Sequence, residues 1–252
     1  MEDDIREAVI LAAGLSTRLR SLTSIPKFGL KINGLPLIYY PIKSLISSGV
    51  EKFTIVVATG FEKVARSIVS SINEAEFVIA LNNHPERENG YTLLCAENYV
   101  KSKCFFVSVC DHIYPSSLPL TLKRKQGSLK SDILVGGDSR PKFIDVSEAT
   151  KIKANGNNNV LEIGKEVEDY THIDVGVFIM NNRVFNLKGE LEKSRRISLS
   201  YIVQTAISRG MSVKVCDIKG IPWKDIDTPE DVSGIVGGKF NEVLKVWWME
   251  NG

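Results

Sequence analysis

Apolar runs alternate with helical patterns through the first half of the chain. Continuous runs rich in β-branched and aromatic residues predict strands covered on both faces, and these are Glu7–Ala12, Lys52–Thr59, Glu76–Ala80 and Cys104–Cys110. Between them, Leu37–Ser48 and Glu62–Ser71 place their apolar residues on one face of a helix. Because strand–helix alternation gives right-handed crossovers, the pattern predicts an α/β fold with a mostly parallel central sheet flanked by helices.

The second half has a different pattern, which predicts a small antiparallel insertion. Short strands at Ala149–Ala154 and Val160–Ile163 flank an asparagine-rich turn of hairpin character. The other expected elements are strands at Asp174–Met180 and Val213–Asp217, helices at Arg183–Glu192 and Leu199–Ser208, and an amphipathic helix within Phe240–Trp248. Such an insertion can form a lid or an acceptor pocket beside a parallel sheet.

Composition narrows the class of protein. The 252 residues are 43% hydrophobic and 25% charged with a net charge of +2, which is typical of a soluble α/β protein and gives no support to nucleic-acid binding. No apolar run approaches the ~20 residues of a membrane span. The acidic start, Met1–Asp4, lacks the apolar core of a signal peptide. The four cysteines have no C-x-x-C spacing, so we expect reduced thiols and a cytoplasmic protein.

The first predicted strand ends in a small-residue turn that two cations follow. The turn contains Ala12, Ala13 and Gly14, and the cations are Arg18 and Lys27. Backbone N–H groups at such a turn, together with mobile positive charge, suit a polyphosphate. The segment matches neither the dinucleotide fingerprint nor the P-loop. An ordinary strand–turn–helix with a solvated arginine is an equally good interpretation of this segment alone.

Two groups of carboxylates are candidate metal ligands. Asp111 follows an apolar strand, where a carboxylate is poorly solvated unless it meets a cation, and Mg²⁺ prefers one or two carboxylates together with phosphate oxygens. Asp225 and Asp227 form the second group. The residues after them have a structural interpretation, with Thr228 capping a helix and Pro229 at its first position.

Three further features carry weaker signals. The polar loop from 83 to 92 contains Asn89-Gly90, which permits a left-handed turn whose backbone and amide groups could face a nucleobase. Lys165 stands beside the predicted hairpin, and His112 is of interest because it follows Asp111. A plain loop and a solvated lysine are the alternatives for the first two.

Together these segments resemble the sugar-phosphate nucleotidyltransferases. The motifs are Leu-Ala-Ala-Gly-x-Ser-Thr-Arg-Leu at 11–19, Pro-Lys at 26–27, Asn-Gly-x-Pro-Leu-Ile at 33–38 and the strand that precedes Asp111, in that order between residues 8 and 231. Segments at 89–93, 111–114, 162–165 and 173–178 resemble more closely the CTP:inositol-1-phosphate cytidylyltransferases, which make CDP-inositol for di-inositol phosphate solutes in heat-loving archaea. Ser16 and Cys110 depart from the family, which has glycine at both positions.

The resemblance implies a Rossmann-like nucleotidyltransferase fold that transfers CMP from CTP to inositol 1-phosphate with Mg²⁺ and releases pyrophosphate. It implies one domain over 1–252, with a nucleotide-binding half to about 125, an acceptor and metal half to about 235, and a C-terminal helix at about 238–250. Another acceptor, such as phosphocholine or a sugar 1-phosphate, with CTP, UTP or dTTP is an open alternative, and a non-catalytic regulatory subunit is a less favoured one. A homodimer and a membrane synthase fused in a longer protein also remain open.

The resemblance further implies roles for single residues. The catalytic residues would be Arg18, Lys27 and Asp111. The metal ligands would be Asp111 with Asp225 or Asp227. The residues that contact base and ribose would be Ala12, Ala13, Gly14, Asn83, Asn89 and Gly90. The acceptor's phosphate would meet Lys165, and its hydroxyls would meet Asp174.

Overall fold

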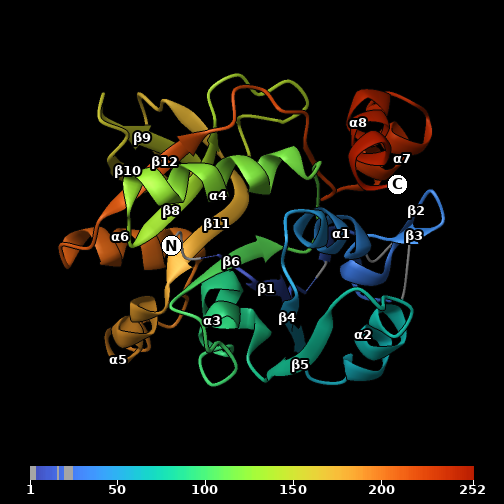
Figure 1. Ribbon diagram of the computed structural model, residues 1–252, viewed down its shortest axis with the longest axis horizontal. Helices are drawn as coiled ribbons and strands as arrows, with labels where there is room; N and C mark the ends of the chain where they lie inside the picture. Colours follow the sequence, from blue (N-terminus) through green and yellow to red (C-terminus); the bar gives the residue numbers. More distant parts are fainter. Residues whose placement is uncertain (1–3, 16, 20–24) are drawn as a thin grey trace.

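A nine-stranded mixed sheet forms the centre of the molecule (Figure 1). The structure is a computed structural model that describes residues 4–15, 17–19 and 25–252, so Ser16 lies outside it. The strands follow the order β10-β9-β11-β6-β1-β4-β5, with β8 beside β11 and β12 beside β8. They are β1 Glu7–Ala12, β4 Lys52–Ala58, β5 Glu76–Asn82, β6 Cys104–Val109, β8 Ile133–Asp138, β9 Lys151–Ala154, β10 Val160–Gly164, β11 His172–Asn181 and β12 Val213–Asp217.

The predicted parallel half of the sheet and the antiparallel insertion are both confirmed. β1 lies between β6 and β4, β5 adds to the outer side of β4, and all three pairings are parallel. β11 runs antiparallel to β6, and β9 and β10 form the expected hairpin. The carboxyl ends of β1 and β6 therefore lie next to each other, at the edge where open α/β sheets bind ligands.

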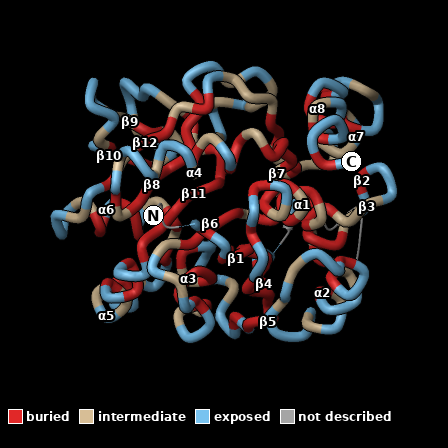
Figure 2. The backbone as a smooth tube through the Cα atoms, viewed as in Figure 1, coloured by how far each residue is buried: buried red, intermediate tan, exposed pale blue. Residues whose placement is uncertain are grey.

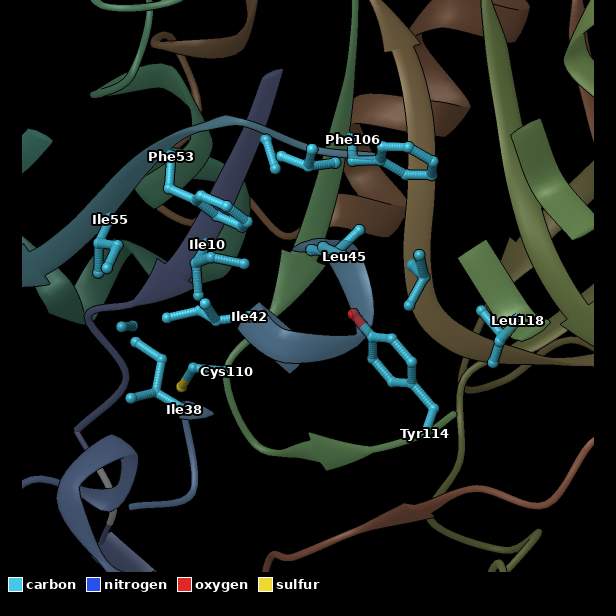
Figure 3. Packing of buried hydrophobic residues seen from close by; sticks show 14 of the residues in the cluster. Ile10, Ile38, Ile42, Leu45, Phe53, Ile55, Phe106, Cys110, Tyr114 and Leu118 are labelled. Atoms are coloured by element: carbon cyan, nitrogen blue, oxygen red, sulfur yellow. The ribbon is translucent and has the colours of Figure 1, made fainter. Parts of the chain in front are cut away.

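Helices cover both faces of the sheet. They are α1 Tyr39–Ser47, α2 Glu62–Val69, α3 Glu88–Leu94, α4 Ser117–Leu129, α5 Lys188–Leu191, α6 Leu199–Ser208, α7 Pro229–Val236 and α8 Asn241–Asn251. Because successive strand residues point to opposite faces, β1 supplies both cores. Ile10 joins Ile42 of α1 and Leu118 of α4 on one face (Figure 3), and Val9 joins Leu93 of α3 on the other. Figure 2 shows the buried strands between the more exposed outer helices.

The C-terminal helix, α8, packs on α1 in a third apolar cluster. Trp247 is buried there, with its ring centroid 4.7 Å from that of Tyr40 and its indole N–H donating to Ser44 Oγ at 3.0 Å. The predicted helix is thus confirmed, and it packs against its own chain. No helix of the described residues is both long and apolar enough to cross a membrane.

The structure corrects two expectations of local conformation. Residues 83–92 are not a plain loop, because they include a 3-10 turn at Pro85–Arg87 and the start of α3. The left-handed residue is Glu88, with φ of 73°, whereas Gly90 is helical. Gly90 is required instead by packing, since a Cβ there would lie 2.6 Å from the Ile197 carbonyl oxygen.

The second correction concerns 183–192, where a continuous helix was expected. The chain forms a 3-10 helix, Asn182–Leu187, followed by the single turn of α5.

The sequence pattern did not predict strand β8 of the main sheet, because two glycines, Gly136 and Gly137, interrupt its apolar run. A Cβ on Gly136 would lie 2.7 Å from Val175 Cγ2, so close packing of neighbouring strands explains the glycine.

A two-stranded ribbon outside the main sheet joins the two acidic segments. It pairs β7, His112–Ile113, antiparallel with β13, Lys224–Asp225. The backbone N–H of Ile226 also donates to the Asp111 carbonyl oxygen at 3.0 Å. Residues more than a hundred positions apart in the sequence therefore meet beside the carboxyl end of β6. A second small ribbon pairs β2, Lys31–Ile32, with β3, Leu35–Pro36.

Candidate active site

Two adjoining cavities open where β1 and β6 end. The first, called the loop cavity, encloses about 500 Å³ and is lined by the turn after β1, by Lys27 and by the start of α3. The second, called the hairpin cavity, encloses about 590 Å³ and lies between the β9–β10 hairpin, the start of α6 and the β7–β13 ribbon. The residues that line both are Glu88, Asn89, Val109, Asp111, Lys165 and Asp227.

Lys27 forms an ion triad with two carboxylates at the boundary of the cavities. Its Nζ lies 2.7 Å from Asp111 Oδ2 and also donates to Asp227 Oδ1. The lysine side chain is only 12% exposed. Burial disfavours its charge, but the two carboxylates outweigh burial and raise the pKa of Lys27. Burial likewise acts against the charge of Asp111, yet Lys27 and His112 hold the pKa of that carboxyl well below its usual range.

His112 orients the other oxygen of Asp111. Its Nδ1 lies 2.7 Å from Asp111 Oδ1, and its ring stacks on the indole of Trp223. The indole N–H of Trp223 donates to Asp138 Oδ2 at 2.9 Å, which fixes the stacking surface. Burial lowers the pKa of His112, but the carboxylates of Asp111, Asp225 and Asp227 prevail, and the net shift is upward.

Asp225 and Asp227 have different surroundings. The Nζ of the buried Lys224 lies 2.7 Å from Asp225 Oδ1 and 2.7 Å from Asp231 Oδ1, so Asp225 already has a cation of its own. Asp227 instead shares the Lys27 ammonium with Asp111. The predicted helix start is confirmed, because Thr228 and Asp231 form a reciprocal capping box on α7. Asp227 therefore lies at the end of a rigidly held turn.

The predicted phosphate-binding cations lie at the cavity walls. Arg18 lines the loop cavity and Lys165 lines both cavities. The same oxygen, Glu148 Oε2, lies 3.3 Å from Arg18 Nη2 and 3.8 Å from Lys165 Nζ. All three side chains are more than half exposed, so these contacts can be exchanged for contacts with a ligand.

The structure separates the remaining predicted residues into two groups. The residues that line the loop cavity are Ala12, Ala13, Gly14 and Asn89. Asn83 and Gly90 are absent from the described lining of both cavities. Asn83 accepts a hydrogen bond from Thr59 Oγ1, and Gly90 packs on the backbone at 197–198. Asn89 Oδ1 accepts from the Leu199 N–H at 2.9 Å, which ties α3 to the start of α6.

Asp174, which the sequence assigned to the hydroxyls of the acceptor substrate, lines the hairpin cavity. Burial raises the pKa of its carboxyl to about 6, opposed by the Gly176 N–H and by His112. Its Oδ1 accepts that N–H at 2.8 Å. A carboxyl in this setting is a strong acceptor for ligand hydroxyl groups, because desolvation strengthens its hydrogen bonds.

Sequence reasoning missed the segment that precedes α6. Arg196 lines the loop cavity and Ser198 lines the hairpin cavity, as does Ser200 in the first turn of α6. The segment is held against α3 by hydrogen bonds from the Tyr91 N–H to the Ile197 carbonyl and from the Ile197 N–H to the Arg87 carbonyl. These contacts span about a hundred residues and leave no local signal in the sequence.

The donor set of the triad fits a hard divalent cation. Asp111 and Asp227 already flank one positive charge, and oxygen ligands of this kind suit Mg²⁺. Within the described residues there is no group of three or more histidine, cysteine or acidic side chains that could hold a metal by itself. Two carboxylates are enough for Mg²⁺, which commonly completes its shell with water and substrate phosphates.

Comparison with known proteins agrees with this site. Residues 8–141 match the MobA-like NTP transferase domain. The solved structure of the inositol-1-phosphate CTP transferase from T. maritima superimposes with a TM-score of 0.88 and 33% identity, covering 96% of this chain and 98% of that one. Two bifunctional IPC transferase and DIPP synthase proteins also match over 90% of this chain, at 34% identity in Aquifex aeolicus and 33% in Archaeoglobus fulgidus.

The chain spans about half the length of these curated relatives, 50% of the first and 42% of the second. More distant solved structures, such as a UDP-glucose pyrophosphorylase complexed with UDP-glucose (TM-score 0.76, 17% identity), share the fold. The family model covers more than half of the chain, and the T. maritima structure is matched along nearly its whole length. The chain therefore belongs to the nucleotidyltransferase family that contains the MobA-like NTP transferase domain.

Proposed function

We propose that this chain transfers CMP from CTP to inositol 1-phosphate. A phosphate oxygen of inositol 1-phosphate attacks the α-phosphorus of CTP, the bond from that phosphorus to the β-phosphate oxygen breaks, and CDP-inositol and pyrophosphate result. The observation that carries the proposal is the Lys27–Asp111–Asp227 triad at the boundary of two adjoining cavities. The match to the T. maritima inositol-1-phosphate CTP transferase supports this choice of substrates.

The loop cavity would hold CTP. Its turn at Gly14 leaves open space, since a Cβ there would meet nothing within 4 Å, so a triphosphate can approach the backbone closely. Arg18 and Lys27 supply positive charge on this side. Bringing a phosphate monoester dianion to a triphosphate is opposed mainly by charge repulsion, so catalysis rests on positioning and neutralisation.

No general base is required. The second pKa of a phosphate monoester is about 6, so the attacking oxygen is already ionised near neutral pH. Asp111 and Asp227 would hold Mg²⁺, and the ion when bound would neutralise charge on the triphosphate. The work of the remaining residues is to hold the two phosphates in line, and Lys165 is placed to do so because it lines both cavities.

The hairpin cavity has the chemistry of a polyol site. Asp174, Thr150 and Ser200 line it and offer hydrogen-bonding groups to ring hydroxyls. Apart from His112, its described lining contains one aromatic residue, Trp223, whose ring already stacks on His112. Recognition of a quaternary ammonium group uses a cage of several aromatic faces, so this cavity favours inositol phosphate over phosphocholine.

The test is a substrate matrix measured by pyrophosphate release with Mg²⁺. CTP, UTP, dTTP, ATP and GTP are each paired with inositol 1-phosphate, phosphocholine and glucose 1-phosphate. Release only with CTP and inositol 1-phosphate supports the proposal. Release with another pair retains the nucleotidyltransferase reaction and refutes the substrates. Nucleotide binding without release from any pair would favour a regulatory subunit.

A further inference from the structure

We propose that Lys27 occupies the place of the divalent cation in the substrate-free protein, so that a metal ion binds well only when a nucleotide draws the ammonium away. The inference rests on the proposed function, because it takes Asp111 and Asp227 as the metal-binding pair. Its geometrical basis is that one Nζ contacts both carboxylates, at 2.7 Å from Asp111 Oδ2 and in a hydrogen bond to Asp227 Oδ1.

One ammonium group, that of Lys27, bridges the two carboxylates. Like charges at contact distance repel strongly in a poorly solvated site, so a metal ion and the Lys27 ammonium cannot share both carboxylates. The two acidic groups also need a counter-charge, because the Asp111 side chain is only 23% exposed and the Lys27 side chain beside it only 12% exposed. Lys27 supplies that charge in the absence of substrate.

The phosphates of a bound nucleotide can interact with both the Lys27 ammonium and a divalent metal ion. Lys27 lines the loop cavity, so its ammonium can turn from the carboxylates to phosphate oxygens there. The same phosphates provide the additional oxygen ligands that a cation held by only two carboxylates lacks. The exchange keeps charge balanced, since a divalent cation arrives with an anionic nucleotide. Each ligand then strengthens the binding of the other, and the coupling must be reciprocal.

Neighbouring residues restrict metal binding to Asp111 and Asp227. Asp225 is not available as a replacement ligand in the described structure, because Lys224 already pairs with it at 2.7 Å. His112 holds the second oxygen of Asp111 at 2.7 Å. Removing the Lys27 charge should therefore leave Asp111 and Asp227 facing each other without a shared cation, and this pair should then bind a divalent ion directly.

The experiment measures Mn²⁺ binding in the absence of any nucleotide, from the electron paramagnetic resonance signal of the free ion. The variants are Lys27→Met and Lys27→Gln, and the double variant Lys27→Met/Asp111→Asn locates the bound ion. Lys43→Met is the matched control, because Lys43 is also largely buried (17% exposed) and pairs with a carboxylate, Glu74, at 2.7 Å on another part of the surface. Thermal melting shows whether each variant is folded.

We expect the wild-type protein and Lys43→Met to bind Mn²⁺ weakly, a folded Lys27 variant to bind it at least tenfold more tightly, and the double variant to lose this gain. Equal affinity in the wild type and in a folded Lys27 variant would overturn the inference, and so would a gain that survives Asp111→Asn. The substrate matrix tests the proposed function separately. If no pair of substrates releases pyrophosphate, the proposed function is refuted, whatever the Mn²⁺ affinities are. Release from CTP with inositol 1-phosphate and unchanged Mn²⁺ affinity would refute this inference alone.

Discussion

The imidazole of His112 lies almost parallel to the indole of Trp223, with ring centroids 5.4 Å apart and an angle of 12° between the planes. The two residues come from segments more than a hundred positions apart. The stack leaves Nδ1 of the imidazole directed at Asp111 Oδ1, so packing of the β7–β13 ribbon decides the orientation of a proposed metal ligand.

This geometry predicts that His112→Phe impairs turnover without unfolding the protein. Phenylalanine keeps a flat ring for the stack but loses the hydrogen bond to Asp111. Loss of a residue that orients a metal ligand typically costs about 10- to 100-fold in activity or metal affinity. We expect kcat to fall by that factor in a variant that stays folded but melts at a somewhat lower temperature, because Asp111 loses a hydrogen bond that stabilises its charge. Pyrophosphate release and calorimetry measure the two effects. Unchanged kcat in the folded variant would show that His112 has only a structural role.

How far the sequence predicts this fold depends on the range of the contacts. β1 and the turn at Gly14 were predictable, because an unbroken apolar run and a small-residue turn are local signals. β8 was not, because Gly136 and Gly137 weaken the strand pattern and owe their presence to neighbours such as Val215. The helical state of Gly90 was hidden for the same reason, since the surface it contacts lies at 197–198.

For the candidate site, too, the sequence predicts which residues take part better than it predicts which residues they contact. Residue chemistry and family resemblance predict a site that contains Lys27 and Asp111, and in the structure Lys27 Nζ lies 2.7 Å from Asp111 Oδ2. Residue chemistry and resemblance did not reveal that Asn83 and Asn89, which belong to the same polar segment, have different surroundings. Asn89 lines the loop cavity, whereas Asn83 accepts a hydrogen bond from Thr59. Nor did residue chemistry and resemblance separate Asp225 from Asp227, because the difference between them is the partner lysine, Lys224 or Lys27, that tertiary structure supplies.

The contact of α3 with the segment before α6 predicts that Gly90→Ala destabilises the protein. The new Cβ would lie 2.6 Å from the Ile197 carbonyl oxygen, so the backbone must shift, at a cost of about 1–3 kcal/mol. Gly189→Ala is the matched control, because Gly189 is also helical and a Cβ there meets nothing within 4 Å. Urea denaturation should show a lower midpoint for the first variant only. Equal midpoints would contradict the packing argument.

The shared contacts of Glu148 predict that Glu148→Gln tightens substrate binding. In the substrate-free protein this carboxylate competes with ligand phosphates for Arg18 and Lys165. Exposed ion pairs contribute about 0.2–1 kcal/mol, so we expect KM for CTP or inositol 1-phosphate to fall by at most about fivefold. Added salt should reduce the difference, because exposed charges are screened.

Glu166→Gln, which removes an exposed carboxylate next to Lys165 in the sequence, is the control for Glu148→Gln. It should leave both KM values closer to those of the wild type. An identical fall in KM for the two variants would mean that general charge, rather than the Glu148 contacts, is responsible.

The raised pKa of Asp174 predicts a pH-dependent gain in stability for Asp174→Asn. Burial raises this pKa to about 6 from 3.8, so the folded protein binds the proton more tightly than the unfolded chain does. Below about pH 3.8 both states are protonated and the group costs nothing. As pH rises from 3.8 to 6 the unfolded chain ionises first, folding stability falls, and above 6 the full cost remains.

Asparagine has no charge to desolvate, so Asp174→Asn should be more stable than the wild type by about 1–3 kcal/mol at pH 8 and by little near pH 4. The same change should raise KM for inositol 1-phosphate while leaving KM for CTP nearly unchanged, because Asp174 lines the hairpin cavity and not the loop cavity. Denaturation at the two pH values and steady-state kinetics measure both effects. A variant less stable than the wild type at pH 8 would show that the carboxylate is stabilised in the fold, and an unchanged acceptor KM would remove Asp174 from acceptor binding.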